Sequence, residues 1–154
     1  MENRNGLIVE AMATQADGYA EREAALLMLQ KKQKGRKRRI TLGADKAFDA
    51  QDFVVAAREM NVTVHVTKND KGRRSNIDRR TTRHPGYAVS LSRRWLVEKG
   101  FGWLKQTGPM RQVKLRGLHN VDWQFVFSCA AHNLIRLPGL IAQRRGEGLR
   151  EQCA

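Results

Sequence analysis

The sequence predicts an α/β fold, and three successive segments carry this prediction. Residues 39–44 form a β-prone run that ends at Asp45. In residues 53–60, apolar side chains then recur at the i, i+3, i+4 and i+7 spacing of one helical face. The branched residues of 62–67 alternate, as they do in a strand. A strand, a helix and a second strand in this order predict a parallel βαβ unit with a right-handed crossover.

Two further elements are expected before this unit. Residues 7–14 alternate as a short strand, and the Asn5-Gly6 dipeptide before them is a strong hairpin signal. Only residues 1–4 remain to supply the partner strand, so we expect the chain to begin inside a supersecondary unit. Residues 19–31 are rich in Ala, Leu and Glu and lack Gly and Pro, which predicts a helix.

After the βαβ unit, residues 68–88 are polar and basic and predict a long loop. A helix is expected over residues 90–105. A final helix is expected over residues 121–137, ending at Pro138-Gly139. This last helix is apolar nearly all round, so we expect it to be buried. Residues 144–154 are polar and are expected to form a disordered tail.

The composition points to a soluble, nucleic-acid-binding protein with one core. The chain has 154 residues, 41% of them hydrophobic, and a net charge of +14. Such an excess favours polyanions because neutralised phosphates release condensed counterions. Nucleic acid is favoured over a membrane, since the most apolar stretch, residues 123–131, is too short to span a bilayer. The two cysteines form no disulfide framework, which fits a reducing cytoplasm.

Two basic segments are candidate DNA contacts. Residues 31–39 contain seven Lys or Arg in nine positions, and the loop at 68–88 carries several more. A solvated linker is the alternative interpretation of the first segment.

Two carboxylates stand out by their position. Asp45 follows an expected central strand, at the position where open α/β sheets place their ligand sites. Glu98 is expected on a helix with Arg94 and Lys105, all within about 40° of one another on an ideal helix. The alternatives are a turn residue for Asp45 and an ordinary surface ion pair between Arg94 and Glu98.

Residues 94–105 resemble the C-terminal signature of bacterial insertion-sequence DDE transposases. That signature places Tyr, Arg, Glu and Lys with two, three and six residues between them, and Arg94, Glu98 and Lys105 match it, whereas Leu91 stands at the tyrosine position. Residues 44–49 resemble the block around the second catalytic aspartate. Residues 3–9 and 111–117 are also similar to segments of this group, so the resemblance covers residues 1–143.

The resemblance implies an RNase H-like α/β fold, here incomplete, lacking the first strand and most of the second. Residues 1–143 would be a partial catalytic domain. It also implies two Mg²⁺ or Mn²⁺ ions, with Asp45 as the second carboxylate ligand and Glu98 as the third. Arg94 and Lys105 would hold the phosphates of transposon ends. Further DNA contacts are expected at Lys46, Arg36, Lys37, Arg38, Arg73, Arg74, Arg79 and Arg80.

No position matches the first aspartate of the family. Glu10 and Asp17 are the candidate substitutes, and both are poorly placed. We therefore expect an N-terminally truncated fragment that performs no transposition alone. The resemblance further implies a homodimer that acts on DNA in the cytoplasm, at the nucleoid, and no membrane partner.

Three rival interpretations remain. The chain could be a non-catalytic basic DNA-binding fragment, or an RNA- or ribosome-associated protein, on charge alone. A metal site at Cys129 and His132 is the third, but these two residues are more readily explained as core residues.

Overall fold

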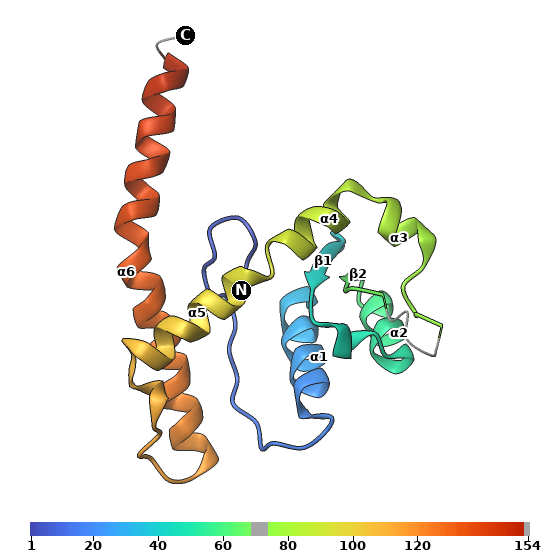
Figure 1. Ribbon diagram of the computed structural model, residues 1–154, viewed down its shortest axis with the longest axis horizontal. Helices are drawn as coiled ribbons and strands as arrows, with labels where there is room; N and C mark the ends of the chain where they lie inside the picture. The colour runs from blue at the N-terminus through green and yellow to red at the C-terminus, as the bar shows by residue number, and fades with distance from the viewer. Residues whose placement is uncertain (69–73, 153–154) are drawn as a thin grey trace. The chain divides into compact units, whose positions relative to one another are not determined.

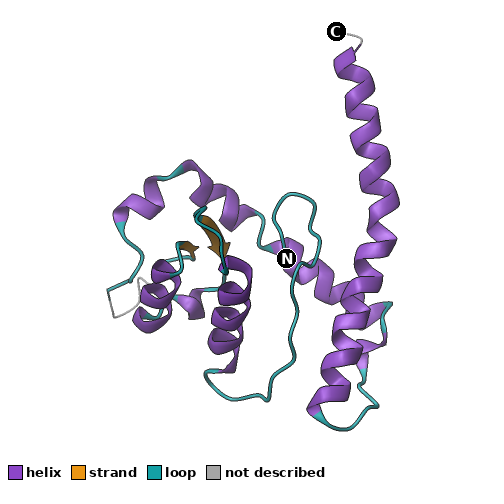
Figure 2. Cartoon of the chain, turned by 180° about the vertical axis from the view of Figure 1, so that it is seen from behind, coloured by secondary structure: helices purple, strands orange, loops and turns teal. Residues whose placement is uncertain are grey.

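The computed structural model describes residues 1–68 and 74–152, without the side chains of residues 147–152. The chain forms two compact units. One comprises Thr14–Trp95, and the other combines Met1–Ala13 with Leu96–Ala154. Helices make up most of the chain, and the two strands are short (Figure 1, Figure 2).

The Thr14–Trp95 unit contains the predicted strand–helix–strand arrangement. Strands β1 and β2 are parallel neighbours, with Ile40 opposite Val62 and Gly43 opposite His65. The prediction of a parallel pair joined by a helix is confirmed. The elements in chain order are α1 (Ala20–Gln33), β1 (Ile40–Gly43), the 3₁₀ turn η1 (Lys46–Phe48), α2 (Gln51–Glu59) and β2 (Val62–His65).

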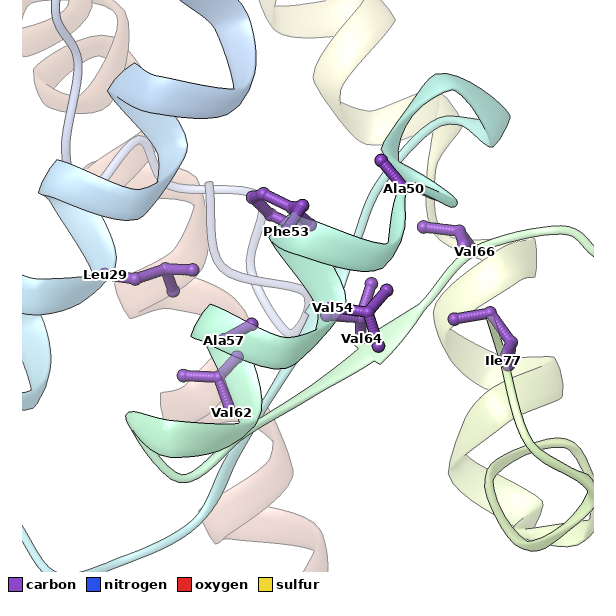
Figure 3. Packing of buried hydrophobic residues seen from close by; sticks show 9 residues of the cluster. All are labelled: Leu29, Ala50, Phe53, Val54, Ala57, Val62, Val64, Val66 and Ile77. Atoms are coloured by element: carbon purple, nitrogen blue, oxygen red, sulfur yellow. The ribbon is translucent and has the colours of Figure 1, made fainter. Parts of the chain in front are cut away.

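A small hydrophobic core holds this unit together. Phe53 and Ala57 of α2 are at most 1% exposed and pack with branched residues of β2 and with Leu29 of α1 (Figure 3). Ile77, from beyond β2, completes the cluster. The apolar spacing that predicted α2 is thus the spacing of its buried face.

The N-cap position of helix α2 is not occupied by the neighbouring residue whose type is common at that position. Asp49 has the residue type of an N-cap, but Ala50 occupies that position. The Asp49 side chain is fully buried and accepts hydrogen bonds from the backbone N–H of Asn76 at 2.8 Å and from its side-chain amide at 3.2 Å. Asp49 therefore ties the segment around Asn76 to the end of η1.

The prediction of one long loop over residues 68–88 was wrong for its second half. Two short helices, α3 (Arg79–Arg83) and α4 (Pro85–Ser92), occupy it. Asp78 caps α3 by accepting from the N–H of Thr81 at 2.8 Å, and Pro85 opens α4, where its missing N–H costs nothing. The segment is polar and lacks an apolar periodicity, so the beginnings of α3 and α4 could not be recognised from the sequence. Residues 69–73, including Arg73, lie outside the described residues.

A single helix over residues 90–105 was also wrongly predicted. Helix α4 ends at Ser92, and α5 (Trp95–Gln106) begins after a turn at Arg93 and Arg94. Neither Gly nor Pro marks this turn in the sequence. Arg93 adopts φ −93° and ψ −2°, the bridge conformation that ends a helix.

The second unit contains α5, the 3₁₀ turn η2 (Pro109–Arg111) and α6 (Leu118–Gln152), with residues 1–13 packed against them. The predicted strand at residues 7–14 does not form. Instead, the side-chain amide of Asn133 bonds both backbone groups of Ile8, at 2.8 and 2.7 Å. The carboxylate of Asp122 accepts from the N–H of Ala13. Side chains of α6 thus replace a partner strand.

Gly6 does form the expected turn. Its φ is +68°, which glycine adopts without strain, and the N–H of Glu2 bonds the carbonyl of Leu7 at 2.9 Å. The turn is therefore present without the hairpin ladder.

Helix α6 departs from the prediction in length and in burial. It passes through Pro138 and continues to Gln152, so the predicted end at Pro138-Gly139 was wrong. A proline removes one helical hydrogen bond without necessarily ending a helix. Burial is one-sided: Ser128, Cys129 and His132 are buried, whereas several large apolar side chains are exposed.

By length and composition, the part of α6 from Leu118 to Gly146 could cross a membrane. The apolar run seen in the sequence is therefore part of a longer helix than expected. One such helix is weak evidence, because helices of soluble proteins pass the same criterion.

Candidate active site

Asp45 leaves the sheet at the carboxyl end of β1. The N–H of Ala44 bonds the carbonyl of His65 at 3.2 Å, which extends the pairing of the strands by one residue. Asp45 is itself extended, with ψ 164°, and opens η1. Its side chain is 69% exposed, so the carboxylate is accessible to a cation or to DNA-bound ions. This is the position at which open α/β sheets bind ligands.

Arg94 reaches Asp45 from the turn after α4. A guanidinium nitrogen of Arg94 donates a hydrogen bond to a carboxylate oxygen of Asp45, forming an ion pair. The Asp45 carboxylate is exposed and the Arg94 side chain is 32% exposed, so water screens the pair and its contribution to stability is small, on the order of 1 kcal/mol or less. Its significance is positional, because two of the candidate site residues are in contact although 49 positions separate them.

Helix α4 is attached to the same end of the sheet by two polar contacts. The ring nitrogen Nδ1 of His65 lies 2.8 Å from the hydroxyl of Ser90, and the hydroxyl of Tyr87 donates to the carbonyl of Val66 at 2.7 Å. His65 and Ser90 are both buried. The pKa of His65 is held below its ordinary value by burial and, secondly, by the nearby charge of His84, which favours the neutral imidazole.

Sequence reasoning had left His65 without a role. The one feature of the sequence that pointed to a structural role for His65 was its position in the alternating segment 62–67. No feature of the sequence pointed to Ser90. The structure assigns both to the support of the turn that carries Arg94.

Glu98 and Lys105 lie on α5 and are exposed. Seven positions apart, they are within about 20° of each other around the helix. Glu98 is in the first turn, where the helix dipole favours a carboxylate, and Lys105 is in the last turn, where it favours a cation. Arg94 does not share this stripe, because it precedes the helix; the predicted three-residue stripe was wrong in this respect.

The four residues thus divide between the two units. Asp45 and Arg94 belong to Thr14–Trp95, whereas Glu98 and Lys105 belong to the unit that includes Leu96–Ala154. Convergence of Asp45 and Glu98 on one cleft stays a prediction. Among the described side chains, those of residues 1–68 and 74–146, no three His, Cys, Asp or Glu are grouped so that they could hold a metal ion.

The candidate DNA-binding cations other than Arg94, which is half-buried, are exposed wherever they are described. Lys46 follows Asp45 in η1, and a basic cluster follows the end of α1. Two contacts hold the backbone near α3. The N–H of Asn76 donates to the carboxylate of Asp49, and Arg58 forms an ion pair with Asp78 at 3.0 Å. The candidate DNA-binding cations of these two regions are Arg36, Lys37, Arg38, Arg74, Arg79 and Arg80, and each is exposed.

Cys129 and His132 are core residues of α6, as the simpler interpretation expected. Burial raises the pKa of the Cys129 thiol and lowers the pKa of His132, which keeps both side chains neutral. The His132 ring packs edge-on against Trp103, with 5.3 Å between ring centroids. Cys153 lies outside the described residues.

Comparison with known protein families adds an independent finding. Residues 50–138 match the model of the family described as "Transposase DDE domain". This range contains Arg94, Glu98 and Lys105, and it begins five positions after Asp45. No curated protein and no solved structure matches the chain.

The match covers more than half of the chain, so the chain belongs to the transposase DDE domain family. Membership carries a role in DNA transposition, with DNA as the partner. The net charge of +14 is consistent with a polyanionic partner.

Proposed function

We propose that this chain forms the latter part of an RNase H-like catalytic domain of an insertion-sequence transposase. Asp45 and Glu98 are two of its carboxylate ligands for divalent cations, and residues 94–105 are its Arg-Glu-Lys signature. The chain acts on transposon ends in the cytoplasm, at the nucleoid. The observation that carries the proposal is the contact of Arg94 with Asp45 at the carboxyl end of β1.

The parallel β1–α2–β2 arrangement supports the fold assignment. In such a sheet the carboxyl ends of parallel strands share one edge, and ligands bind there. Asp45 stands at this edge, and Arg94 is delivered to it by α4. The position of Asp45 and its contact with Arg94 are observed in the structure and are not inferred from the family resemblance.

The donor chemistry of Asp45 and Glu98 fits Mg²⁺ or Mn²⁺. Both side chains are exposed carboxylates, and hard divalent cations prefer oxygen ligands. Asp45 and Glu98 would hold the cations, which when bound supply activation of an attacking oxygen and stabilisation of a leaving oxygen on phosphorus. These two residues alone do not complete the set of three carboxylates that the resemblance implies.

The basic residues position the DNA. Arg94 presents a planar guanidinium that binds phosphate through two parallel hydrogen bonds, and Lys105 and Lys46 contribute point charges. In the absence of DNA, Arg94 neutralises Asp45 instead. DNA and the Asp45 carboxylate therefore compete for the same guanidinium.

Divalent-cation binding tests the assignment. Titration of the chain with Mn²⁺, followed by the loss of the free-ion electron paramagnetic resonance signal, should give weak binding that falls in both Asp45→Asn and Glu98→Gln. Asp52→Asn, a change to an acidic residue outside the proposed site, is the matched control. Equal binding by all three variants and the wild type would remove both ligands from the proposal.

Catalysis is tested separately. With a labelled transposon end and Mn²⁺, we expect no strand transfer by this chain alone, because none of its residues matches the first aspartate of the family. Strand transfer above background would contradict the proposed inactivity.

A non-catalytic DNA-binding fragment is the second candidate, favoured by the exposed cations around α1 and α3. Glu98→Gln separates the two functions. It should leave DNA affinity unchanged or slightly raised in a protein that only binds DNA, and it should lower Mn²⁺ binding in one whose Glu98 holds a cation.

A further inference from the structure

A regular stripe of apolar side chains runs along α6 between residues 123 and 141. Successive members are four, three, four, three and four positions apart, which is the a and d spacing of a heptad repeat. Each member is exposed. We call this set the α6 stripe; it comprises Trp123, Phe127, Ala130, Leu134, Leu137 and Ile141.

The α6 stripe is not the side of the helix that faces its own unit. Ser128, Cys129 and His132, at the intervening positions, are the buried residues of this part of α6. Phe125 stacks on Phe101 of α5, with 6.1 Å between ring centroids, and Asn133 bonds the backbone of Ile8. Within its own unit, helix α6 therefore has one packed face and a second apolar face that the described residues of that unit leave exposed.

The exposed area is large for surface residues. Trp123, Phe127 and Leu134 are 61%, 62% and 66% exposed, and the rings of Trp123 and Phe127 stack at 5.4 Å. Since aromatic side chains carry about 150–250 Å² each and aliphatic ones somewhat less, the stripe leaves on the order of 600 Å² uncovered. Two such stripes would bury about 1,200 Å², which reaches the size of a specific interface.

The spacing indicates the kind of partner. An average of 3.5 residues keeps a stripe in line with a second helix that coils around the first, because each side chain enters a hole of the facing helix. A single helix surrounded by lipid is apolar all round, whereas α6 carries Gln124, His132 and Asn133 on its other sides.

The charges along the stripe permit self-association despite the basic chain. Residues 118–141 contain one Arg, Arg136, whose guanidinium donates to the carbonyl of Asn5 at 2.7 Å on the side that faces its own unit. Their one acidic residue, Asp122, accepts from the N–H of Ala13. Two copies of this segment would meet without the like-charge repulsion that a net charge of +14 otherwise imposes.

We propose that the α6 stripe is a dimerisation surface that pairs with the α6 stripe of a second copy of this chain. The proposal deepens the proposed function, since it supplies a surface for the homodimer that the family resemblance implies. It does not depend on Asp45 or Glu98 as ligands. Metal binding and dimerisation can therefore fail independently.

Leu134 and its neighbour Ile135 offer a matched test. They are 66% and 64% exposed, but Leu134 is in the stripe and Ile135 is about 100° away from it on the helix. Sedimentation velocity of the nuclease-treated full chain, at high salt to exclude bridging by DNA, should give a dimer for the wild type and for Ile135→Glu. Leu134→Glu should weaken self-association at least tenfold.

Circular dichroism should report the same helix content for both variants, because each changed side chain is exposed. Phe127→Glu, a second change in the stripe, should reproduce the loss. A monomeric wild type, or equal losses in Leu134→Glu and Ile135→Glu, would overturn the proposal. So would a monomer that floats with phosphatidylserine-containing vesicles through the same stripe.

Discussion

His65 and Ser90 share a buried hydrogen bond, 2.8 Å from ring nitrogen to hydroxyl, at the carboxyl end of the parallel sheet. The backbone carbonyl of His65 also accepts from the N–H of Ala44, the residue before Asp45. Ser90 precedes Arg94 by one helical turn. One histidine thus supports both partners of the exposed ion pair, through its backbone on one side and its side chain on the other.

Ser90→Ala should destabilise the protein, because it leaves the buried Nδ1 of His65 without its hydrogen-bond partner. A buried polar group without a partner costs about 1–3 kcal/mol. The urea midpoint of unfolding measures the loss. Ser92→Ala is the matched control, since its hydroxyl bonds the carbonyl of Val89 in an exposed position and should matter little. Equal midpoints for the two variants would show that the buried bond contributes nothing.

The same histidine gives the stability of the protein a pH dependence. Burial lowers the pKa of His65 in the folded state, so the unfolded chain binds the proton more readily. Stability should be fully present above about pH 6.5 and should fall as the pH drops from there towards the lower folded pKa. His132 has its pKa lowered in the same direction and adds to the effect.

His65→Gln tests the contribution of His65 to the pH dependence of stability. Gln retains a polar group that can contact Ser90 but does not titrate, so the variant should show a smaller loss of stability between pH 7 and pH 5. The His132 contribution should remain. An unchanged slope of unfolding free energy against pH would exclude His65 as a source.

Arg94→Ala should weaken DNA binding without much change in stability. The ion pair with Asp45 is exposed, so its loss should cost about 1 kcal/mol or less. If Arg94 contacts phosphate, the slope of log K against log[salt] should become shallower by about 0.9, the contribution of one phosphate contact. Fluorescence anisotropy with a labelled duplex at several salt concentrations provides both values.

Arg93→Ala is the control for charge alone. Arg93 is an exposed neighbour of the same charge, and the Arg94 guanidinium, not that of Arg93, pairs with Asp45. The same loss of affinity and slope in both variants would mean that only net charge matters at this turn.

The sequence predicted the elements whose signal is local. The spacing of Phe53 and Ala57 identified α2, and the branched residues before His65 identified β2, since periodicity alone specifies a buried face. Asp45 was recognised because a strand end is visible in the sequence. Its contact with Arg94 was not, because that contact depends on a turn without Gly or Pro.

The missed features depend on contacts between distant residues. Helix α4 ends before Arg94. Ser90 of this helix bonds His65, 25 positions away, and Arg94 bonds Asp45, 49 positions away. Local secondary-structure propensity carries no information about contacts between residues so far apart in the sequence. The stretch at residues 7–13 alternates like a strand, but its backbone bonds go to side chains of α6, 125 and 109 positions away. Tertiary context overrode the local pattern in both cases.

Asn133→Ala should release the N-terminal segment from α6. Asn133 bonds both the N–H and the carbonyl of Ile8, so one substitution leaves two partly buried backbone groups without partners. Hydrogen exchange measured residue by residue should show the amide of Ile8 exchanging at least tenfold faster, while the amides in the middle of α6 keep their protection. Asn120→Ala is the control, because the Asn120 amide bonds only the exposed carbonyl of Arg116, at 2.9 Å. If the Ile8 amide exchanges equally fast in the wild type and in Asn133→Ala, side chains of α6 do not hold this segment in place of a partner strand.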